Sequence, residues 1–449
     1  MSAPLYVVHC IDTEGPLYES LEATFDRLRN IVGVDLEPTR ENVRRLRAKD
    51  IDLGGKESVA ALIVSEELLA YNGTWDQVDA MLREMLTPQF RRRFADAAGT
   101  GWTYSWFLVD HVGYETNPRR RDIGYHNVFD HYVSLLRETG SDQDDVQYHF
   151  HPTSTYREAH VCATSYLRSP HLLETLARRI IDRHWFPSCF RPGFHAERPD
   201  AHWFLEQWLP FDFANQALSS DVALQEDVAA GRLGDWRRAP ADWSHYNPHH
   251  DDYQVPGSCR RTIFRCLNVG TRFRLLDQAQ VDAAFARAAS GRPTVLAFTN
   301  HDFRDMRPDV ARTHAMLVDA SLRHPEVEWR HARALDAARA VLGRADAPPL
   351  DLRVSLVRDG DRGRLDVEAN HDTFGPQPFL ALQSLDRRYL NDNFDLHVPF
   401  RRWSYTFDGD TVPLRALDHL GVAAGDSSGS VHVVVIDANG RVVADRHHG

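Results

Sequence analysis

The stretch VVHCIDTEGP, residues 7–16, contains an apolar run that ends in two carboxylates, Asp12 and Glu14. The apolar residues predict a buried β-strand, which the Gly15-Pro16 step ends. Because side chains alternate along a strand, Asp12 and Glu14 share one face if the extended backbone continues. Two carboxylates on one face repel each other unless a cation or a proton lies between them. Taken alone, however, the commoner interpretation is a pair of solvated turn residues.

Six further apolar runs follow this stretch, and helical patterns lie between several of them. Apolar residues three and four positions apart predict helices within residues 121–140, 169–184 and 276–291. Strands that alternate with helices are typical of parallel β/α units, so the predicted fold class is α/β. About seven strands predict an irregular (β/α) barrel, whose functional groups lie at the carboxyl ends of the strands. After the first, the predicted strands cover residues 102–109, 145–151, 188–193, 211–215, 261–268 and 294–302.

Two other regions depart from this alternation. Residues 15 to about 100 carry helical patterns and no convincing strand, which predicts a helical insertion after strand one that could cover one mouth of the barrel. Near residue 345 the sequence GRADAPPLD is typical of a linker, and short alternating strands with turn signals follow it. We therefore expect a barrel domain over residues 1–345 and a β-sandwich-like, all-β domain over residues 350–449.

The bulk composition excludes several classes of protein. The chain has 449 residues, of which 43% are apolar and 26% charged, as is typical of globular proteins. A net charge of −12 disfavours nucleic acid and anionic membranes as partners. Five cysteines without CxxC spacing argue against a disulfide framework or a cysteine-type zinc site. There is no apolar run of about 18 residues and no signal-peptide pattern, so we expect a cytoplasmic protein without a transmembrane segment.

The segment DVQYHFHP, residues 145–152, places His149 and His151 two positions apart at the end of a predicted strand. Both rings then leave the same side of the strand, which is a common way to supply two imidazoles to one divalent metal. The alternative is a pair of packed or surface histidines, in a chain that holds 24 of them. The carboxylates of Asp12 and Glu14 at another strand end favour the metal site.

Two more strand ends carry polar groups suited to catalysis. In CFRPGFH, Arg191 precedes a Pro-Gly turn, and its planar guanidinium could hold a carboxylate in one orientation. In TVLAFTNHDF, His301 and Asp302 follow the clearest buried strand, and a histidine there could donate a proton to a leaving group. The alternatives are an exposed turn arginine and a helix-capping or loop His-Asp pair.

Together these four motifs resemble those of the polysaccharide deacetylase superfamily, also described as NodB-homology or carbohydrate esterase family 4. The resemblance covers roughly residues 5–305 and leaves the insertion unaccounted for. It implies an irregular (β/α) barrel with a divalent metal held by one carboxylate and two histidines. It also implies removal of N- or O-acyl groups, mostly from amino sugars.

The resemblance implies a role for each motif residue. IDTEG looks like the first motif, with Asp12 as catalytic base and Glu14 as metal carboxylate. HFHP stands in for the histidine motif, which would make His149 and His151 the metal ligands. Since the family has adjacent aspartates and histidines four positions apart, this chain is similar to a divergent branch, such as deacetylases of surface-polysaccharide gene clusters. The assignment of base and ligand between Asp12 and Glu14 stays open.

The later motifs complete the implied machinery. FRPG resembles the third motif, so that Arg191 would orient Asp12. His301 resembles the late histidine and would be the general acid, tuned by Asp302. Three further residues are spare candidates for these roles: His9, His195 and Glu197.

Residues 247–274 could set specificity, because they concentrate arginines in an otherwise acidic protein. Such a cluster predicts an anionic substrate group, for example a phosphate or a uronate, unless the arginines pair with nearby acids. Aromatic side chains could stack on a sugar, although large aromatics are commonly core residues. The candidates for substrate contact are Arg260, Arg261, Arg265, His250 and Trp106. The same loop also contains His249, Asp251 and Asp252, and the other aromatic residues considered are Trp102, Tyr125 and Trp243.

The sequence therefore predicts a metal-dependent hydrolase that removes an N-acyl group, acetyl or formyl, from an amino sugar or glycan precursor. Zinc is the first candidate cofactor, and Co²⁺, Ni²⁺ or Fe²⁺ would fit the same ligands. One alternative is an amidohydrolase of a small N-acyl metabolite or sugar nucleotide. Another is a catalytically inactive carbohydrate-binding protein. The expected partner is a small-molecule or glycan substrate, and a homo-oligomer is left open.

Overall fold

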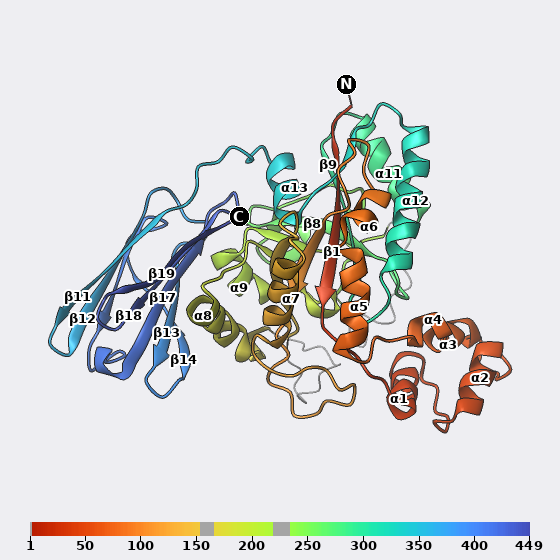
Figure 1. The fold of residues 1–449 in the computed structure, drawn as a ribbon, viewed down its shortest axis with the longest axis horizontal. Coiled ribbons are helices and arrows are strands. Elements are labelled where there is room, and N and C mark those ends of the chain that lie inside the picture. The colour runs from red at the N-terminus through yellow and green to blue at the C-terminus, as the bar shows by residue number, and fades with distance from the viewer. Residues whose placement is uncertain (1, 153–165, 219–233) are drawn as a thin grey trace.

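The structure is a computed structural model that describes residues 2–152, 166–218 and 234–449 (Figure 1). Seven parallel strands form a closed barrel in the order β1-β2-β3-β4-β5-β8-β9, because β1 pairs with both β2 and β9. Each of the seven predicted apolar runs supplies one of these strands, which confirms the predicted barrel. The barrel strands are β1 (Leu5–Thr13), β2 (Tyr104–Leu108), β3 (Asp145–Phe150), β4 (Cys189–Pro192), β5 (Phe211–Asn215), β8 (Thr262–Asn268) and β9 (Thr294–His301).

Helices surround the barrel and bury their apolar faces against it. In α11, for example, Val281, Ala284, Phe285 and Ala288 are buried at helical spacing, and Asp277 caps the first turn. The helices that follow barrel strands are α7 (Asn127–Glu138), α8 (His171–Arg183), α9 (Ala201–Trp208), α11 (Gln278–Ala289) and α12 (Arg307–Arg323), and α13 (Ala334–Val341) follows the short strand β10. Two short pairings lie outside the barrel: β10 (Trp329–His331) on the start of β1, and the hairpin of β6 (Pro248–His249) and β7 (Asp252–Pro256).

The predicted helical insertion between β1 and β2 consists of two parts. The helices α1–α4 enclose a small apolar cluster of their own and lie near the carboxyl end of β1 (Figure 1), whereas α5 and α6 pack on the barrel core. Asn72 ties the insertion to the end of β9, since its backbone N–H donates to Phe303 O at 2.8 Å. The helices are α1 (Leu21–Val32), α2 (Arg40–Ala48), α3 (Glu57–Ile63), α4 (Glu66–Leu69), α5 (Trp75–Met85) and α6 (Pro88–Arg93).

The C-terminal region contains two antiparallel sheets that share a buried apolar cluster, which includes Leu365 and Trp403 of one sheet and Leu382 and Val422 of the other. This arrangement confirms the predicted all-β region. One sheet has the order β11 (Leu352–Asp359), β12 (Arg362–Ala369), β16 (Arg402–Phe407), β15 (Asp395–Val398). The other has the order β14 (Tyr389–Asp392), β13 (Phe379–Ser384), β17 (Leu417–Gly425), β18 (Val431–Asp437), β19 (Val442–His448).

The outer face of the five-stranded sheet packs on α8 of the barrel (Figure 1). Gly421 of β17 allows this approach, because a Cβ atom at that position would lie only 2.4 Å from the Ile180 side chain. Among the described residues, no helix has the length and apolarity needed to span a membrane. Four cysteines carry free thiols, and Cys162 lies outside the described residues.

Candidate metal centre

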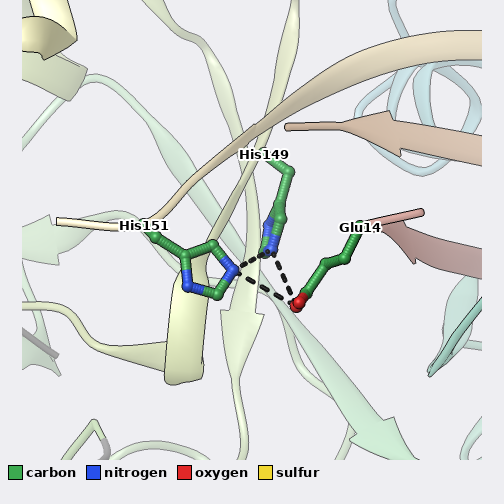
Figure 2. A group of neighbouring side chains, drawn as sticks. All are labelled: Glu14, His149 and His151. Atoms are coloured by element: carbon green, nitrogen blue, oxygen red, sulfur yellow. Dashed lines mark hydrogen bonds and ion pairs between the residues drawn. The ribbon is translucent and has the colours of Figure 1, made fainter. Parts of the chain in front are cut away.

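Three side chains from two strand ends converge at one mouth of the barrel (Figure 2). Glu14 follows β1, His149 belongs to β3, and His151 lies just beyond it. Glu14 Oε1 lies 3.2 Å from His151 Nε2 and 3.9 Å from His149 Nε2, and the two Nε2 atoms are 3.0 Å apart. All three side chains are buried. The structure therefore brings together the carboxylate and the two imidazoles predicted to bind a metal.

The chemistry of these donors fits a divalent cation. His149 Nδ1 lies 2.9 Å from the carbonyl oxygen of Arg191, which can only accept, so Nδ1 carries the proton and Nε2 offers its lone pair to the centre. Ligands about 2.0–2.1 Å from a tetrahedral zinc lie roughly 3.3 Å from one another. Two of the observed distances, 3.0 and 3.2 Å, are close to this value, and the third, 3.9 Å, is longer. Without a cation or a proton between them, two facing Nε2 lone pairs would repel. The residues present thus fit a site of one carboxylate and two histidines.

Burial keeps both imidazoles in the neutral form that binds metal. It lowers the pKa of His149 and of His151 to about 3 each. At neutral pH neither ring carries a charge that would oppose a cation.

These pKa values predict that the metal-free protein is destabilised by acid. The unfolded chain takes up protons at its histidines near pH 6.5, whereas folded His149 and His151 take them up only near pH 3. The free energy of unfolding is therefore unaffected by these two histidines above pH 6.5 and decreases as the pH falls towards 3. Between pH 6.5 and 5 the decrease is about 2 kcal/mol per histidine. Urea unfolding at several pH values measures this slope. The variant with alanine at both positions should have a shallower slope, and an equal slope would contradict the prediction.

Asp12 and Arg191 form a buried ion pair next to the three converging side chains. Arg191 Nε donates to Asp12 Oδ1 at 2.6 Å, and Nη2 donates to Oδ2 at 3.0 Å. Burial alone would raise the pKa of Asp12, but the charge of Arg191 and the nearby His149 hold it well below its usual range. Asp12 is thus ionised and fixed in orientation, in the arrangement predicted for a base and its orienting arginine.

His301 faces the same centre from the end of β9. Its Nε2 atom lies 3.8 Å from Asp12 Oδ2 and 3.8 Å from Glu14 Oε1. Burial lowers the pKa of His301 to about 3, so the ring is neutral at pH 7. To act as an acid, His301 must first receive a proton, and Asp12 Oδ2 at 3.8 Å lies just beyond direct hydrogen-bonding distance of its ring.

Asp302 contacts the backbone just after β1, at Glu14 and Gly15, in place of the predicted contact with His301. Its two carboxylate oxygens accept the N–H groups of Glu14 and Gly15 at 2.8 Å each, and the Tyr132 hydroxyl donates to Oδ2 at 2.6 Å. Burial raises the pKa of Asp302 to about 7, although these donors favour its ionised form. We therefore reassign Asp302 as a positioning residue that fixes the place where Glu14 leaves β1.

Replacement of Asp302 by alanine is expected to destabilise the protein by about 3 kcal/mol and to weaken metal binding, because three buried donors lose their acceptor. Urea unfolding and zinc titration measure the two effects. Asp305→Ala is a matched control, since Asp305 is a partly exposed acid that pairs with Arg307. Full zinc affinity in a destabilised Asp302→Ala variant would contradict the positioning role.

Sequence reasoning missed one residue that contacts the centre directly. The buried Arg121 guanidinium bonds Glu14 Oε2, which leaves Oε1 facing the histidines. Arg121 is the first residue of the stretch 121–140 in which a helix is predicted, but α7 begins only at Asn127, so Arg121 lies in the irregular segment after β2, where helical spacing gives no information on its contacts. Of the spare candidates, His195 lies with its Nδ1 3.3 Å from Arg191 Nη2, whereas His9 is stacked on Phe298 in the core.

The predicted substrate-binding arginines do not line the pocket beside this centre. Arg261 is fully buried and pairs with Glu197, the third spare candidate, at 2.8 Å. Arg265 is buried over the ring of Trp243, with 4.4 Å from its guanidinium carbon to the ring centroid.

The other three predicted contacts also lie elsewhere. Arg260 is exposed, with its guanidinium carbon 4.2 Å from the centroid of the Phe400 ring. Trp106 is fully buried in the core, where its indole N–H donates to Asp144. His250 is exposed, and its Nδ1 atom lies 2.9 Å from Oδ1 of the neighbouring Asp251.

No family model matches the chain, and searches of curated proteins and of solved structures return no match. The resemblance to polysaccharide deacetylases therefore rests on the motifs quoted above. The function has to be argued from the chemistry of the site.

Proposed function

We propose that the chain is a metal-dependent hydrolase that removes an N-acyl group, acetyl or formyl, from an amino sugar or glycan precursor. The observation that carries this proposal is the convergence of Glu14, His149 and His151 beside the Asp12–Arg191 pair at one barrel mouth. A carboxylate and two imidazoles leave coordination positions open, as catalytic metal sites require. The ligand set suits Zn²⁺, and Co²⁺, Ni²⁺ or Fe²⁺ would fit it as well.

In this mechanism each residue has a separate task. When bound, a divalent cation supplies a Lewis acid that polarises the acyl carbonyl and acidifies water, which is needed because Asp12 paired with Arg191 is a weak base. Asp12 accepts the proton of the attacking water, and Arg191 holds the carboxylate in place. Asp12 Oδ2 and His301 Nε2 are 3.8 Å apart, so the two side chains must first approach to hydrogen-bonding distance for this proton to pass to His301, which then donates it to the departing amine.

The inactive carbohydrate-binding protein is the less favoured alternative. A pure binder has no need of a buried, ionised carboxylate held by an arginine and facing a histidine, since buried charges are costly to keep. An amidohydrolase of a small N-acyl metabolite or sugar nucleotide uses the same centre and differs only in substrate. A cytoplasmic location stays a prediction of the sequence.

The test is release of acetate or formate from a panel of N-acyl amino sugars, sugar nucleotides and small N-acyl amides. The chain is first treated with a chelator and then loaded with zinc or cobalt. We expect turnover of at least one class only in the loaded protein. Absence of turnover with every metal and every class, in protein shown to bind one cation per chain, would contradict the hydrolase.

A further inference from the structure

A pocket lined by five arginines opens beside the metal centre, although the chain as a whole carries a net charge of −12. Glu14, His151 and His301 form its inner wall, so a molecule bound there reaches the candidate catalytic groups. The arginines come from the insertion, the β2–α7 segment and the loops after β8 and β9. They are Arg27, Arg119, Arg121, Arg272 and Arg304.

Three of these arginines form ion pairs within the described residues. Arg121 bonds Glu14, as described above. Glu19, which is buried, lies 2.5 Å from Arg27 and 3.3 Å from Arg119. Each of these three guanidinium groups thus has a carboxylate within ion-pair distance, although Glu19 is shared by two of them.

Arg304 has only neutral acceptors. Its Nε and Nη2 atoms donate to the Leu68 carbonyl at 3.2 and 3.1 Å, and its guanidinium lies over the rings of Phe303 and Tyr71. No carboxylate of the described chain lies within ion-pair distance of it. Arg304 therefore adds a positive charge to the pocket that the protein does not compensate.

Arg272 has fewer interactions than Arg304. It is half-buried, and in the part of the chain that the structure describes its guanidinium has no hydrogen bond and no ion pair. Burial and the positive charges of Arg27 and Arg304 lower its pKa to about 9. A guanidinium kept among like charges without an acceptor destabilises the free protein, and an anion in the pocket would remove that cost.

We propose that Arg272 and Arg304 bind a phosphoryl group, and that the N-acyl substrate of this enzyme is a phosphorylated small molecule. The identity of the substrate rests on the proposed hydrolase, whereas the phosphoryl site rests on the pocket alone. Two uncompensated guanidinium groups match the charge of about −1.5 to −2 on a phosphomonoester better than the single charge of a carboxylate. The planar guanidinium fork also suits phosphate oxygens. The side chains of Phe194, Phe273 and Phe303 line the same pocket and offer apolar surface to the remainder of the molecule.

The phosphoryl site is tested by calorimetric titration of the full-length, chelator-treated chain with inorganic phosphate. We expect binding to weaken about tenfold or more in Arg272→Gln/Arg304→Gln, because charge-assisted hydrogen bonds are lost. The double lysine variant should recover part of the affinity. Arg44→Gln, at an exposed arginine of α2 that pairs with Glu41, should bind phosphate as wild type does.

Phosphate binding that is equal in wild type and in the double glutamine variant would overturn the site, as would absence of binding to wild type. Thermal unfolding of the glutamine variant is the control for folding, and we expect its midpoint not to fall, because like charges have been removed.

A second measurement separates this inference from the proposed function. The zinc-loaded chain is assayed with N-acetylglucosamine, N-acetylglucosamine 1-phosphate and UDP-N-acetylglucosamine. We expect kcat/KM to be at least tenfold higher for one phosphorylated compound, and the glutamine variant to lose that preference. The better of the two identifies a phosphomonoester or a nucleotide diphosphate as the source of the phosphoryl group.

The two claims can fail separately. Turnover of the neutral sugar at an equal or higher rate would overturn the phosphorylated substrate and leave the hydrolase standing. Arginine-dependent phosphate binding in a chain that hydrolyses no N-acyl compound would support the phosphoryl site and contradict the hydrolase.

Discussion

Replacement of both His149 and His151 by alanine is expected to abolish tight metal binding and to reduce hydrolysis to the uncatalysed background. The variant keeps only Glu14 of the three converging ligands, and a single carboxylate does not hold zinc in competition with water. Equilibrium dialysis with zinc and the acyl-release assay measure the two losses. The variant should stay folded, because two imidazoles that are buried without charge are replaced by small apolar groups.

Two control variants make this result specific. The described residues contain two further groups of potential metal ligands, one with His202, Glu206 and Cys259 and one with Asp351, His432 and His447. Cys259→Ala and His447→Ala each remove one ligand from these groups and should leave the tightly bound metal and the activity unchanged. Retention of one zinc per chain in the double histidine variant would place the metal elsewhere.

Asp12→Asn is expected to lower the rate of hydrolysis by about 10²–10⁴-fold while zinc binding persists. The amide cannot accept the proton of the attacking water. Zinc binding persists because the three proposed ligands, Glu14, His149 and His151, are unchanged in this variant. The change also leaves Arg191 buried without its counter-charge, so the free energy of unfolding should fall by about 3–5 kcal/mol. Single-turnover rates at saturating zinc, together with urea unfolding, measure both effects.

The same variant decides between the two carboxylates that the sequence left open. If Asp12→Asn loses zinc and Glu14→Gln keeps it, then Asp12 is the ligand and Glu14 the base. The observed distances predict the opposite pattern, because Glu14 Oε1 lies 3.2 Å from His151 Nε2 while both Asp12 oxygens are held by Arg191.

The barrel could be predicted because its strands are buried on both faces and therefore appear as continuous apolar runs bounded by turns. Residues 294–302, for example, gave β9 (Thr294–His301) to within one residue. The sequence pattern gave no comparable signal for α9 (Ala201–Trp208), which is apolar over most of its surface, or for β10 (Trp329–His331), which is too short for any period to appear.

Part of the site could be predicted for the same reason. Glu14, His149 and His151 sit directly at strand ends, and parallel strands bring their carboxyl ends to one mouth. Arg27 comes from α1 of the insertion, and Arg121 and the other pocket arginines come from irregular segments. In both cases the contacts depend on tertiary structure that no local pattern records. Arg121 is 107 residues from Glu14.

The predicted arginine cluster was misplaced because adjacency in sequence does not identify partners in space. Arg260, Arg261 and Arg265 stand together in the chain, but they face different surroundings once β8 forms. Arg261 is buried against Glu197 and Asp212, which belong to segments far from it in sequence. The expectation of an anionic substrate survives as a proposal, carried by Arg272 and Arg304 instead.

The most direct test of the central claim is anomalous diffraction from crystals of the full chain grown with zinc. A peak is predicted about 2.0–2.2 Å from Glu14 Oε1 and from the Nε2 atoms of His149 and His151. Crystals that contain zinc but show no peak at this position would contradict it.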